Sequence, residues 1–470
     1  MKKTKIICTI GPATESLERL KNLVNTGMNI ARLNFSHGDF EEHGNRIARI
    51  HQVNEELQSN IAILLDTKGP EIRCGDFENG SEEFEKGDIV RLVSDPILST
   101  KEKIHIQCPE VFEDVQVGGI FLIDDGKMKL TILEKNPKEL VCRIENPGVI
   151  KSRKGCNVPN VKLSMPFISP KDEADIRFGC KEKVNYIAAS FTRRKEDILD
   201  IRKILAEEKC EDIQIIAKIE NQEGYDNLDE ILEVVDGVMV ARGDLGVDVS
   251  FEKVPIYQKQ IIKRCNAWGK PVITATHMLE SMQANPRPTR AEASDVANAV
   301  LDGTDAIMLS GESAVGMYPI EAVQTMVTIS EGTEAILPYR EKLLASVATS
   351  DRTKEDAIGI SVADTAMALD VAAIVVFTTS GLSARRISKF RPKCPIYAAT
   401  FNERTRRGLA VNWGVSAFTI DEINERDNES ELARHIAKHF GCKEGDTIIV
   451  VAGYPHGSGS TNSMRIIEVE

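Results

Sequence analysis

The fold of this chain is limited most by a regular alternation of short apolar runs with helix-length amphipathic stretches over most of residues 1–340. Near-continuous apolar strands separated by helices indicate a parallel sheet that helices cover on both faces. The apolar runs are Lys5–Ile10, Ile30–Phe35, Ile61–Asp66, Tyr186–Phe191, Ile213–Ile219, Gly237–Ala241, Pro271–Ala275 and Ala306–Leu309. The helical patterns include Arg194–Glu208, Asn227–Val235, Ile256–Trp268 and Arg290–Leu301. This order of strands predicts a β/α (TIM) barrel, and an open doubly wound sheet is the alternative.

One segment interrupts the alternation. Residues 70–165 contain no long helical pattern, and their turn residues include Asp124-Asp125-Gly126. The short strands expected here are Asp88–Val93, Lys103–Gln107, Gly119–Ile123, Lys129–Leu133 and Glu139–Ile144. A structureless loop of this length is uncommon inside a compact chain, so we predict an inserted small β-barrel domain. An insertion after a barrel strand lies at the catalytic face, where it can act as a lid.

The alternation resumes after the barrel as a separate unit. A helix is expected at Asp356–Leu369, with strands at Ala373–Thr378, Ile396–Thr400, Val415–Ile420, Thr447–Ala452 and Met464–Glu470. This pattern indicates a small open α/β domain. The predicted α/β organisation is therefore a barrel domain of residues 1–69 and 166–342, a lid domain of residues 70–165, and a C-terminal domain of residues 343–470.

Composition excludes several classes of protein. The net charge of −13 argues against a nucleic-acid partner or an anionic membrane surface. No apolar run approaches the roughly 18 residues that span a bilayer, and the first apolar stretch is broken at Thr9 and Gly11, unlike a signal peptide. The ten cysteines form no C-x-x-C pair, which fits a reducing compartment better than a zinc site. We expect a cytoplasmic protein without membrane or nucleic-acid partners.

The strongest candidate catalytic group follows the fifth predicted strand. Lys218 and Glu220 are two residues apart and therefore share one face of the strand. Asp244 follows the next strand, and neighbouring strands lie close enough for both carboxylates to hold one Mg²⁺ ion. A lysine beside that ion could neutralise charge on a phosphoryl group during its transfer. The alternative is a structural salt bridge of Lys218 with one of the two carboxylates.

Polar residues also follow the second and third predicted strands. Arg32, Asn34 and Ser36 alternate onto one face, and Asp66 and Thr67 follow the neighbouring strand. Neutral oxygens with a single carboxylate suit a weakly hydrated monovalent cation better than a divalent one. Each segment could instead cap the helix that follows it.

Further polar residues are expected at the same rim. Thr276, Ser310 and Glu312 could support a proton relay, although hydroxyls at helix starts are often N-caps. Gly243-Asp244 is expected to open a tight turn whose N–H groups could hold a carboxylate.

Nucleotide binding here does not use the common motifs, because the sequence has no G-x-x-x-x-G-K-[ST] loop and no protein-kinase motif set. Gly457-Ser458-Gly459-Ser460 lacks the dinucleotide fingerprint. In the last domain, a loop between a strand and a helix offers a phosphate site or an ordinary capped loop. Its candidate residues are Thr378, Thr379, Ser380 and Ser383.

These motifs together resemble the pyruvate kinase family, along essentially the whole chain. The resemblance is to the bacterial type, and because the sequence ends at Glu470 we expect no counterpart of the extra C-terminal domain that some bacterial members carry. It is densest in Arg32–Gly38, Leu65–Arg73, Ile216–Gly224, Met239–Gly246, Ile273–Met282, Pro286–Glu292 and Leu309–Ser313.

The resemblance implies a glycolytic phosphotransferase that converts phosphoenolpyruvate and ADP to pyruvate and ATP. Its implied catalytic residues are Arg32, Lys218 and Thr276, and its substrate-binding residues are Arg32, Lys218, Gly243, Asp244 and Thr276. Glu220 and Asp244 would hold Mg²⁺ or Mn²⁺, and K⁺ would lie at Asn34, Ser36, Asp66 and Thr67. The implied nucleotide-binding residues are Asn34, Phe35, Ser36, His37, Arg73 and Lys154.

The resemblance also carries implications for regulation. Glu71 stands where potassium-dependent members have glutamate and potassium-independent members have lysine, which predicts a potassium requirement. His277 replaces the usual glutamine, and Leu382 replaces a lysine of some bacterial relatives in the effector loop. The family implies a homotetramer and a sugar-phosphate activator at Thr378, Thr379, Ser380 and Ser383.

Two other functions remain open on the sequence. One is a lyase or mutase that acts on phosphoenolpyruvate or pyruvate, which an ADP requirement would exclude. The other is a catalytically silent sugar-phosphate sensor that uses only the last domain, which metal-dependent turnover would exclude.

Overall fold

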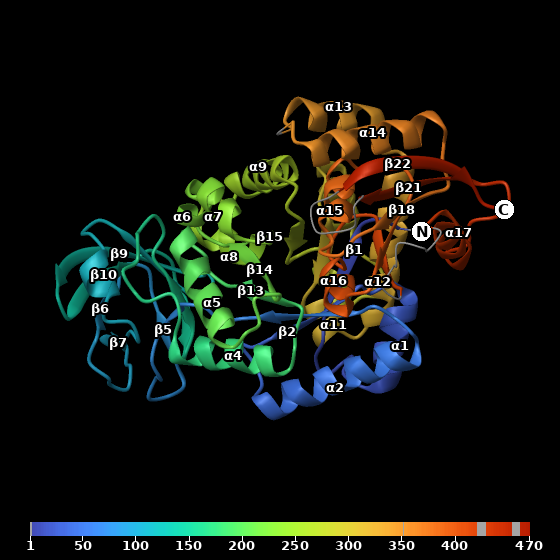
Figure 1. The fold of residues 1–470 in the computed structure, drawn as a ribbon. Helices are drawn as coiled ribbons and strands as arrows, with labels where there is room; N and C mark the ends of the chain where they lie inside the picture. The colour runs from blue at the N-terminus through green and yellow to red at the C-terminus, as the bar shows by residue number, and fades with distance from the viewer. Residues whose placement is uncertain (1, 351, 421–428, 454–460) are drawn as a thin grey trace.

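Eight parallel strands close into a barrel at the centre of the molecule (Figure 1). The computed structural model describes residues 2–350, 352–420, 429–453 and 461–470. The barrel strands are β1 (Lys5–Thr9), β2 (Ile30–Asn34), β3 (Ala62–Asp66), β13 (Tyr186–Ala189), β14 (Gln214–Ile219), β15 (Gly237–Ala241), β16 (Val272–Ala275) and β17 (Ala306–Leu309). β1 pairs with both β2 and β17, so the sheet has no free edge. The predicted barrel is confirmed, and the open sheet is excluded.

Helices cover the outside of this barrel. They are α1 (Leu17–Thr26), α2 (Phe40–Glu56), α4 (Pro170–Lys181), α5 (Lys195–Glu207), α6 (Gln222–Asp226), α7 (Leu228–Val234), α8 (Arg242–Asp248), α9 (Lys253–Trp268), α10 (Arg290–Asp302), α11 (Gly311–Ala314) and α12 (Pro319–Ala335), with a 3₁₀ turn η1 (Glu280–Gln283). Residues along each strand alternate between two cores: Ile6 and Cys8 pack toward the helices, whereas Ile7 packs inside the barrel. Both faces of each strand are thus apolar, which is why the strands appear in the sequence as continuous apolar runs without alternating polar residues.

The segment between β3 and α4 forms the inserted β unit, here called the lid. Its elements are β4 (Ile72–Arg73), β5 (Ser81–Phe84), β6 (Ile89–Val93), β7 (Lys103–His105), α3 (Val111–Asp114), β8 (Ile120–Ile123), β9 (Met128–Asn136), β10 (Glu139–Ile144), β11 (Gly148–Lys151) and β12 (Gly155–Asn157). Seven strands form one sheet in the order β4-β12-β8-β9-β10-β6-β7. A bridge between Cys74 and Ile106 brings its two ends together around a separate apolar core.

The last part of the chain is an open α/β unit on the other side of the barrel (Figure 1). It contains α14 (Lys354–Ala368), β18 (Ala373–Phe377), α15 (Leu382–Lys389), β19 (Ile396–Thr400), α16 (Glu403–Gly408), β20 (Val415–Thr419), α17 (Glu429–His439), β21 (Thr447–Gly453) and β22 (Thr461–Glu468), and α13 (Tyr339–Ala348) leads into it. The strand order is β20-β19-β18-β21-β22, with only β22 antiparallel to its neighbour. α14 and α15 pack on one face and α17 on the other.

The strands predicted for the barrel and the C-terminal unit match observed strands, whereas no range was predicted for the long helices α2 and α12 or for α13. The lid strands β4, β5, β11 and β12 were not predicted, because runs this short carry little periodicity. The glycine-rich segment 457–460 lies outside the described residues. Within the described part of the chain, no helix has the length and apolar character needed to cross a membrane.

Buried polar contacts join the C-terminal unit to the barrel. Arg391 donates to Asp305 Oδ1 at 2.8 Å and to the Gly303 carbonyl oxygen at 2.9 Å. The Asp305 side chain also accepts the main-chain N–H of Val272 and of Trp413. Its charge is therefore buried and compensated mainly by one arginine.

We predict that Arg391→Met lowers the free energy of unfolding by about 3 kcal/mol or more, because it leaves the buried Asp305 carboxylate without its counterion. Differential scanning calorimetry should show a lower unfolding midpoint. Lys393→Met is the matched control, since Lys393 forms an exposed ion pair with Asp370 and its loss should leave the midpoint unchanged. Equal midpoints for the two variants would contradict this account of the interface.

Candidate active site

Lys218 is held by opposite charges at the carboxyl end of the barrel. Its Nζ lies 2.9 Å from Glu220 Oε1 and 3.1 Å from Asp66 Oδ1, and it donates to Ser190 Oγ at 2.7 Å. Burial alone would lower the pKa of the Lys218 ammonium, but Asp66 and Glu220 raise it above its ordinary value. The salt bridge offered by the sequence as the alternative is therefore present, and it fixes a charged ammonium at the rim.

Glu220 follows directly after β14 and is almost fully buried. Its Oε2 accepts a hydrogen bond of 2.6 Å from the main-chain N–H of Phe191. Burial raises the pKa of its carboxyl, the Lys218 ammonium opposes that rise, and the nearby Asp244 adds to it. Its Oε1 has the Lys218 ammonium as its neighbour, with Nζ 2.9 Å away. A buried carboxylate oxygen with spare lone pairs fits a divalent cation.

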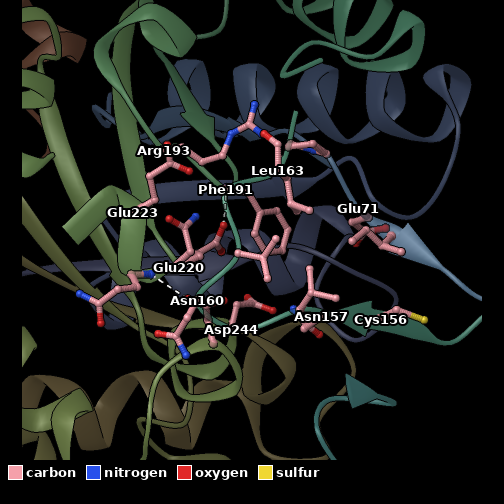
Figure 2. A pocket seen from close by; sticks show the side chains of 18 of the residues that line it. Glu71, Cys156, Asn157, Asn160, Leu163, Phe191, Arg193, Glu220, Glu223 and Asp244 are labelled. Carbon is pink, nitrogen blue, oxygen red and sulfur yellow. Dashed lines mark hydrogen bonds between the residues drawn. The ribbon is translucent and has the colours of Figure 1, made fainter. Parts of the chain in front are cut away.

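Glu220 and Asp244 both line a cavity of about 540 Å³ between the barrel rim and the lid (Figure 2). In the described part of the chain, no group of three or more His, Cys, Asp or Glu side chains is arranged to hold a metal ion. Two carboxylates would leave the other coordination positions of Mg²⁺ to water and substrate oxygens, which is usual for this ion. The residues present therefore fit the ion that the sequence predicts.

The structure corrects one local prediction. Gly243 and Asp244 do not form a tight turn but lie in the first turn of α8. The Gly243 N–H, which was expected to be open to a carboxylate, donates to Thr276 Oγ1 at 2.7 Å. Arg242, the first residue of α8, donates to the Thr276 carbonyl oxygen across the rim.

Thr276 lies in a strained turn after β16. Thr276 and His277 have φ values of +64° and +54°, in the left-handed region that side chains with a Cβ seldom adopt. Arg242 holds this turn by donating to the carbonyl oxygens of Ala275 at 3.2 Å and Thr276 at 2.7 Å. The Thr276 hydroxyl donates in turn to the Ala275 carbonyl oxygen. Several contacts thus fix the position of this hydroxyl beside α8.

Arg32 and Asp66 form a second part of the same charge network. Arg32 Nε donates to Asp66 Oδ2 at 2.6 Å, and its NH1 donates to Thr9 Oγ1 at 2.9 Å. Burial alone would raise the pKa of Asp66, but Arg32 and Lys218 lower it. Asp66 is therefore a buried anion shared by the two cations.

The four oxygen-bearing residues predicted to bind a monovalent cation lie at adjacent strand ends. Asn34 and Asp66 are directly paired in the β2–β3 register, and Asn34 Oδ1 accepts the Ser36 N–H at 3.1 Å. Thr67 follows Asp66, and its Oγ1 accepts the Ser190 N–H. These residues therefore lie at the ends of the neighbouring strands β2 and β3, where the K⁺ site is predicted.

The predicted nucleotide-binding residues divide into two groups. Arg73 and Lys154 line the cavity, where Arg73 pairs with Glu71 at 2.7 Å and Lys154 with Asp124 at 2.8 Å. Glu71, on the same rim, lies between Lys68 and Arg73.

The second group, Asn34 to His37, does not line this cavity. The Phe35 side chain is buried and stacks on His43 with ring centroids 3.9 Å apart. The His37 carbonyl oxygen accepts from the same histidine ring at 2.8 Å. The Phe35 side chain therefore packs in the core, its main-chain N–H donates to the Asp66 carbonyl oxygen, and its own carbonyl oxygen accepts from Lys171.

The proposed relay at the end of β17 is occupied by structural contacts. Glu312 is fully buried, and its two oxygens accept the N–H groups of Leu279 and Ser310 at 3.0 and 2.8 Å. Burial raises the pKa of this carboxyl. Glu312 ties the loop after β16 to the loop after β17 and so supports the turn that carries Thr276.

The candidate effector loop lies between β18 and α15. Thr378 Oγ1 accepts the Gly381 N–H at 2.9 Å, and the Thr379 carbonyl oxygen accepts from the Thr405 hydroxyl at 2.9 Å. Ser383 hydrogen-bonds to Thr461. The loop with Thr378, Thr379, Ser380 and Ser383 is thus held by one contact of its own and by contacts with Thr405 and Thr461.

Comparison with known proteins identifies the family. A model described as "Pyruvate kinase, barrel domain" matches residues 1–323, and one described as "Pyruvate kinase, alpha/beta domain" matches residues 356–467. The chain belongs to the pyruvate kinase family. Pyruvate kinases of Geobacillus stearothermophilus and Bacillus licheniformis are each 52% identical, over 99% and 100% of this chain and 80% and 81% of their own lengths. A crystal structure of a pyruvate kinase from Cryptosporidium parvum superposes with a TM-score of 0.96 at 38% identity, covering 100% of this chain and 96% of that one.

Three residues that contact the site of this pyruvate kinase family member were missed from the sequence. Ser190 bonds to Lys218, Phe191 bonds to Glu220 through its N–H, and Arg242 holds the turn at Thr276. Of the three, only Arg242 could have been identified from the sequence, because it stands beside Gly243 at the end of a predicted strand. Phe191 acts through its main chain, which residue identity does not reveal.

Arg242→Met should lower kcat/KM about tenfold, or about 1.4 kcal/mol, because the strained turn at Thr276 loses the guanidinium that holds two of its carbonyl oxygens. Arg264→Met is the matched control, since Arg264 pairs with Asp229 on the outer helices. Steady-state assays of both variants test the role, and equal activities would contradict it.

Proposed function

We propose that this chain transfers the phosphoryl group of phosphoenolpyruvate to ADP, giving pyruvate and ATP in glycolysis. The observation that carries the proposal is the Lys218 ammonium, fixed by Asp66 and by Glu220, which lines the same cavity as Asp244. A preorganised positive charge of this kind stabilises a phosphoryl group as its negative charge redistributes. Membership of the pyruvate kinase family supports this reaction.

Glu220 and Asp244 would hold Mg²⁺ or Mn²⁺. When bound, the ion would offset the charge of the phosphate and carboxylate oxygens of the substrate. The support from this chain is the buried Glu220 carboxylate, whose Oε1 lies beside the Lys218 ammonium, and the position of both carboxylates in one cavity. The Phe191 N–H orients the other Glu220 oxygen.

The substrate side would be bound by Arg32, Lys218, Gly243, Asp244 and Thr276. The guanidinium of Arg32 lies beside Asp66, at the same rim as Lys218, and could approach a phosphate oxygen. Thr276 carries a hydroxyl that already accepts one N–H and donates to one carbonyl oxygen. We assign this hydroxyl to the protonation of the enolate, to which it would pass a proton before being reprotonated by water.

ADP would enter from the lid side of the cavity. Arg73 and Lys154, which line the cavity, would supply cations for its phosphates. Asn34, Phe35, Ser36 and His37 lie at the end of β2 outside this cavity, and they would contribute only if the nucleotide extends along the barrel rim. Closure of the lid would exclude water, which strengthens the electrostatic contacts inside. An ADP requirement separates this reaction from that of a lyase or mutase.

K⁺ would lie at Asn34, Ser36, Asp66 and Thr67, and Glu71 would belong to the potassium-dependent type. The β2–β3 register that pairs Asn34 with Asp66 supports this site. The proposal also includes a cytoplasmic homotetramer, and a sugar-phosphate effector at Thr378, Thr379, Ser380 and Ser383.

The test of the reaction measures pyruvate formation from phosphoenolpyruvate and ADP with Mg²⁺, in the presence of K⁺ and in its absence. We expect turnover that requires ADP, Mg²⁺ and K⁺. Activity without K⁺ would remove the potassium site and keep the enzyme. Absence of activity under every ion condition, in folded protein supplied with sugar phosphates, would contradict the proposed reaction and favour the sensor.

Lys218→Met should lower kcat by about a hundredfold to a thousandfold, because the transferring phosphoryl group loses its fixed ammonium. Circular dichroism should show an unchanged fold. Lys68→Met is a matched control, since Lys68 pairs with Glu71 at the rim at 3.4 Å and is more exposed. Turnover of the Lys218 variant near that of the unmodified protein would rule out the role of this ammonium.

A further inference from the structure

Both chain connections to the lid meet one short loop, Ser190–Arg193, which follows β13. On the outgoing side, Ser190 Oγ donates to the Thr67 carbonyl oxygen at 2.7 Å. Gly69 has φ +74°, and a Cβ built on it would lie 2.8 Å from Ser190 Cβ. Only a glycine allows the outgoing chain to pass this close to the loop.

The returning connection is held by Arg193. Its NH1 donates to the Leu163 carbonyl oxygen at 2.9 Å, and its NH2 donates to the Met165 carbonyl oxygen at 3.2 Å. Arg193 is 5% exposed, and its own main chain is fixed by Asp197 and Asn227. Figure 2 shows Arg193 and Leu163 together at the edge of the cavity. An arginine bound to two carbonyl oxygens of a linker has a positional role that a lysine cannot fully reproduce.

The returning connection, residues 163–165 and here called the linker, is also hydrogen-bonded to the lid. Asp114 of α3 accepts the Ser164 N–H at 2.7 Å and the Ser164 hydroxyl at 3.0 Å. The carbonyl oxygens of residues 163 and 165 are thus hydrogen-bonded to the barrel, through Arg193. The N–H of residue 164 is hydrogen-bonded to the lid, through Asp114. A second cavity, of about 450 Å³, is lined by residues 164–168 on the side of Arg194. The linker therefore has open space on both sides, and these hydrogen bonds determine its position.

The loop also contacts the two charged groups of the active site. Ser190 Oγ accepts from Lys218 Nζ, and the Phe191 N–H donates to Glu220 Oε2. Phe191 has φ +56°, a strained value that its surroundings must maintain. A shift of Lys218 or Glu220 on binding would move the loop, and the loop would then move both lid connections.

We propose that Ser190–Arg193 is the mechanical link between occupancy of the metal and phosphoryl site and closure of the lid, with Arg193 as a positioning residue for the reaction. The inference rests on the proposed function, because it assigns a purpose to lid closure in phosphoryl transfer. Arg193 acts through the linker carbonyl oxygens and does not touch the reacting atoms. Its loss therefore affects the step that needs a closed lid more than the binding of the first substrate.

The experiment compares Arg193→Met, Arg193→Lys and Asp114→Ala with the unmodified protein and with Arg194→Met. Arg194 is the matched control, because it is the neighbouring arginine and its side chain is 49% exposed. For Arg193→Met we expect kcat to fall about tenfold, with the KM for phosphoenolpyruvate changed by less than about twofold. Arg193→Lys should recover part of kcat, and Asp114→Ala should lower kcat from the lid side without loss of Mg²⁺ affinity.

Hydrogen exchange of the amides at residues 163–165 gives the readout that a merely structural role would not change. In the unmodified protein and Arg194→Met, Mg²⁺ with phosphoenolpyruvate should slow this exchange, and in Arg193→Met it should not. Retained protection in Arg193→Met, or a kcat equal to that of Arg194→Met, would overturn the proposal. Because the exchange is measured without turnover, it stays informative if the unmodified protein fails to phosphorylate ADP, an outcome that would contradict the proposed reaction alone.

Discussion

The site depends on one buried arrangement of charge, in which two cations and two carboxylates meet at the carboxyl ends of neighbouring strands. Asp66 lies between Arg32 and Lys218, and Glu220 lies on the far side of Lys218. Isolated charges at this depth would be very unfavourable, so each carboxylate has to be matched by a cation. The barrel provides this match because parallel strands end at the same rim. Removing one member leaves another buried charge uncompensated, which constrains all four residues together.

Around this network, strained backbone conformations position individual polar groups such as the Thr276 hydroxyl and the Phe191 N–H. Thr276 and His277 have positive φ values, and so does Phe191, whose N–H orients Glu220. Such conformations persist only where surrounding contacts hold them, and here Arg242 and Glu312 supply those contacts for the Thr276 turn. The rigid rim thus fixes the positions of the reactive groups. The lid, in contrast, is joined to the barrel by two connections that both contact one loop.

The barrel could be predicted from the sequence because its strands are buried on both faces and read as apolar runs such as Ile213–Ile219. Lys218, Glu220 and Asp244 could be predicted to meet because the strand period and spacing place them on one rim. The helical geometry of Gly243 and Asp244 could not, since Arg242 and Thr276 act across strands far apart in sequence. Main-chain donors such as Phe191 N–H leave no mark in residue identity, and strands of two to four residues in the lid carry no measurable period.

The arrangement of Ser190–Arg193 explains how a small change at the rim could reach the lid. A lid closed by its own contacts with ADP would respond to the nucleotide alone. Here the loop that packs against both lid connections also bonds to Lys218 and Glu220. Occupancy of the metal and phosphoryl site can therefore change the position of the lid through this loop. Packed interiors shift between discrete arrangements and do not deform continuously, which favours a loop with two positions over a graded response. The coupling would then assemble the water-free site only after its charged groups are in place.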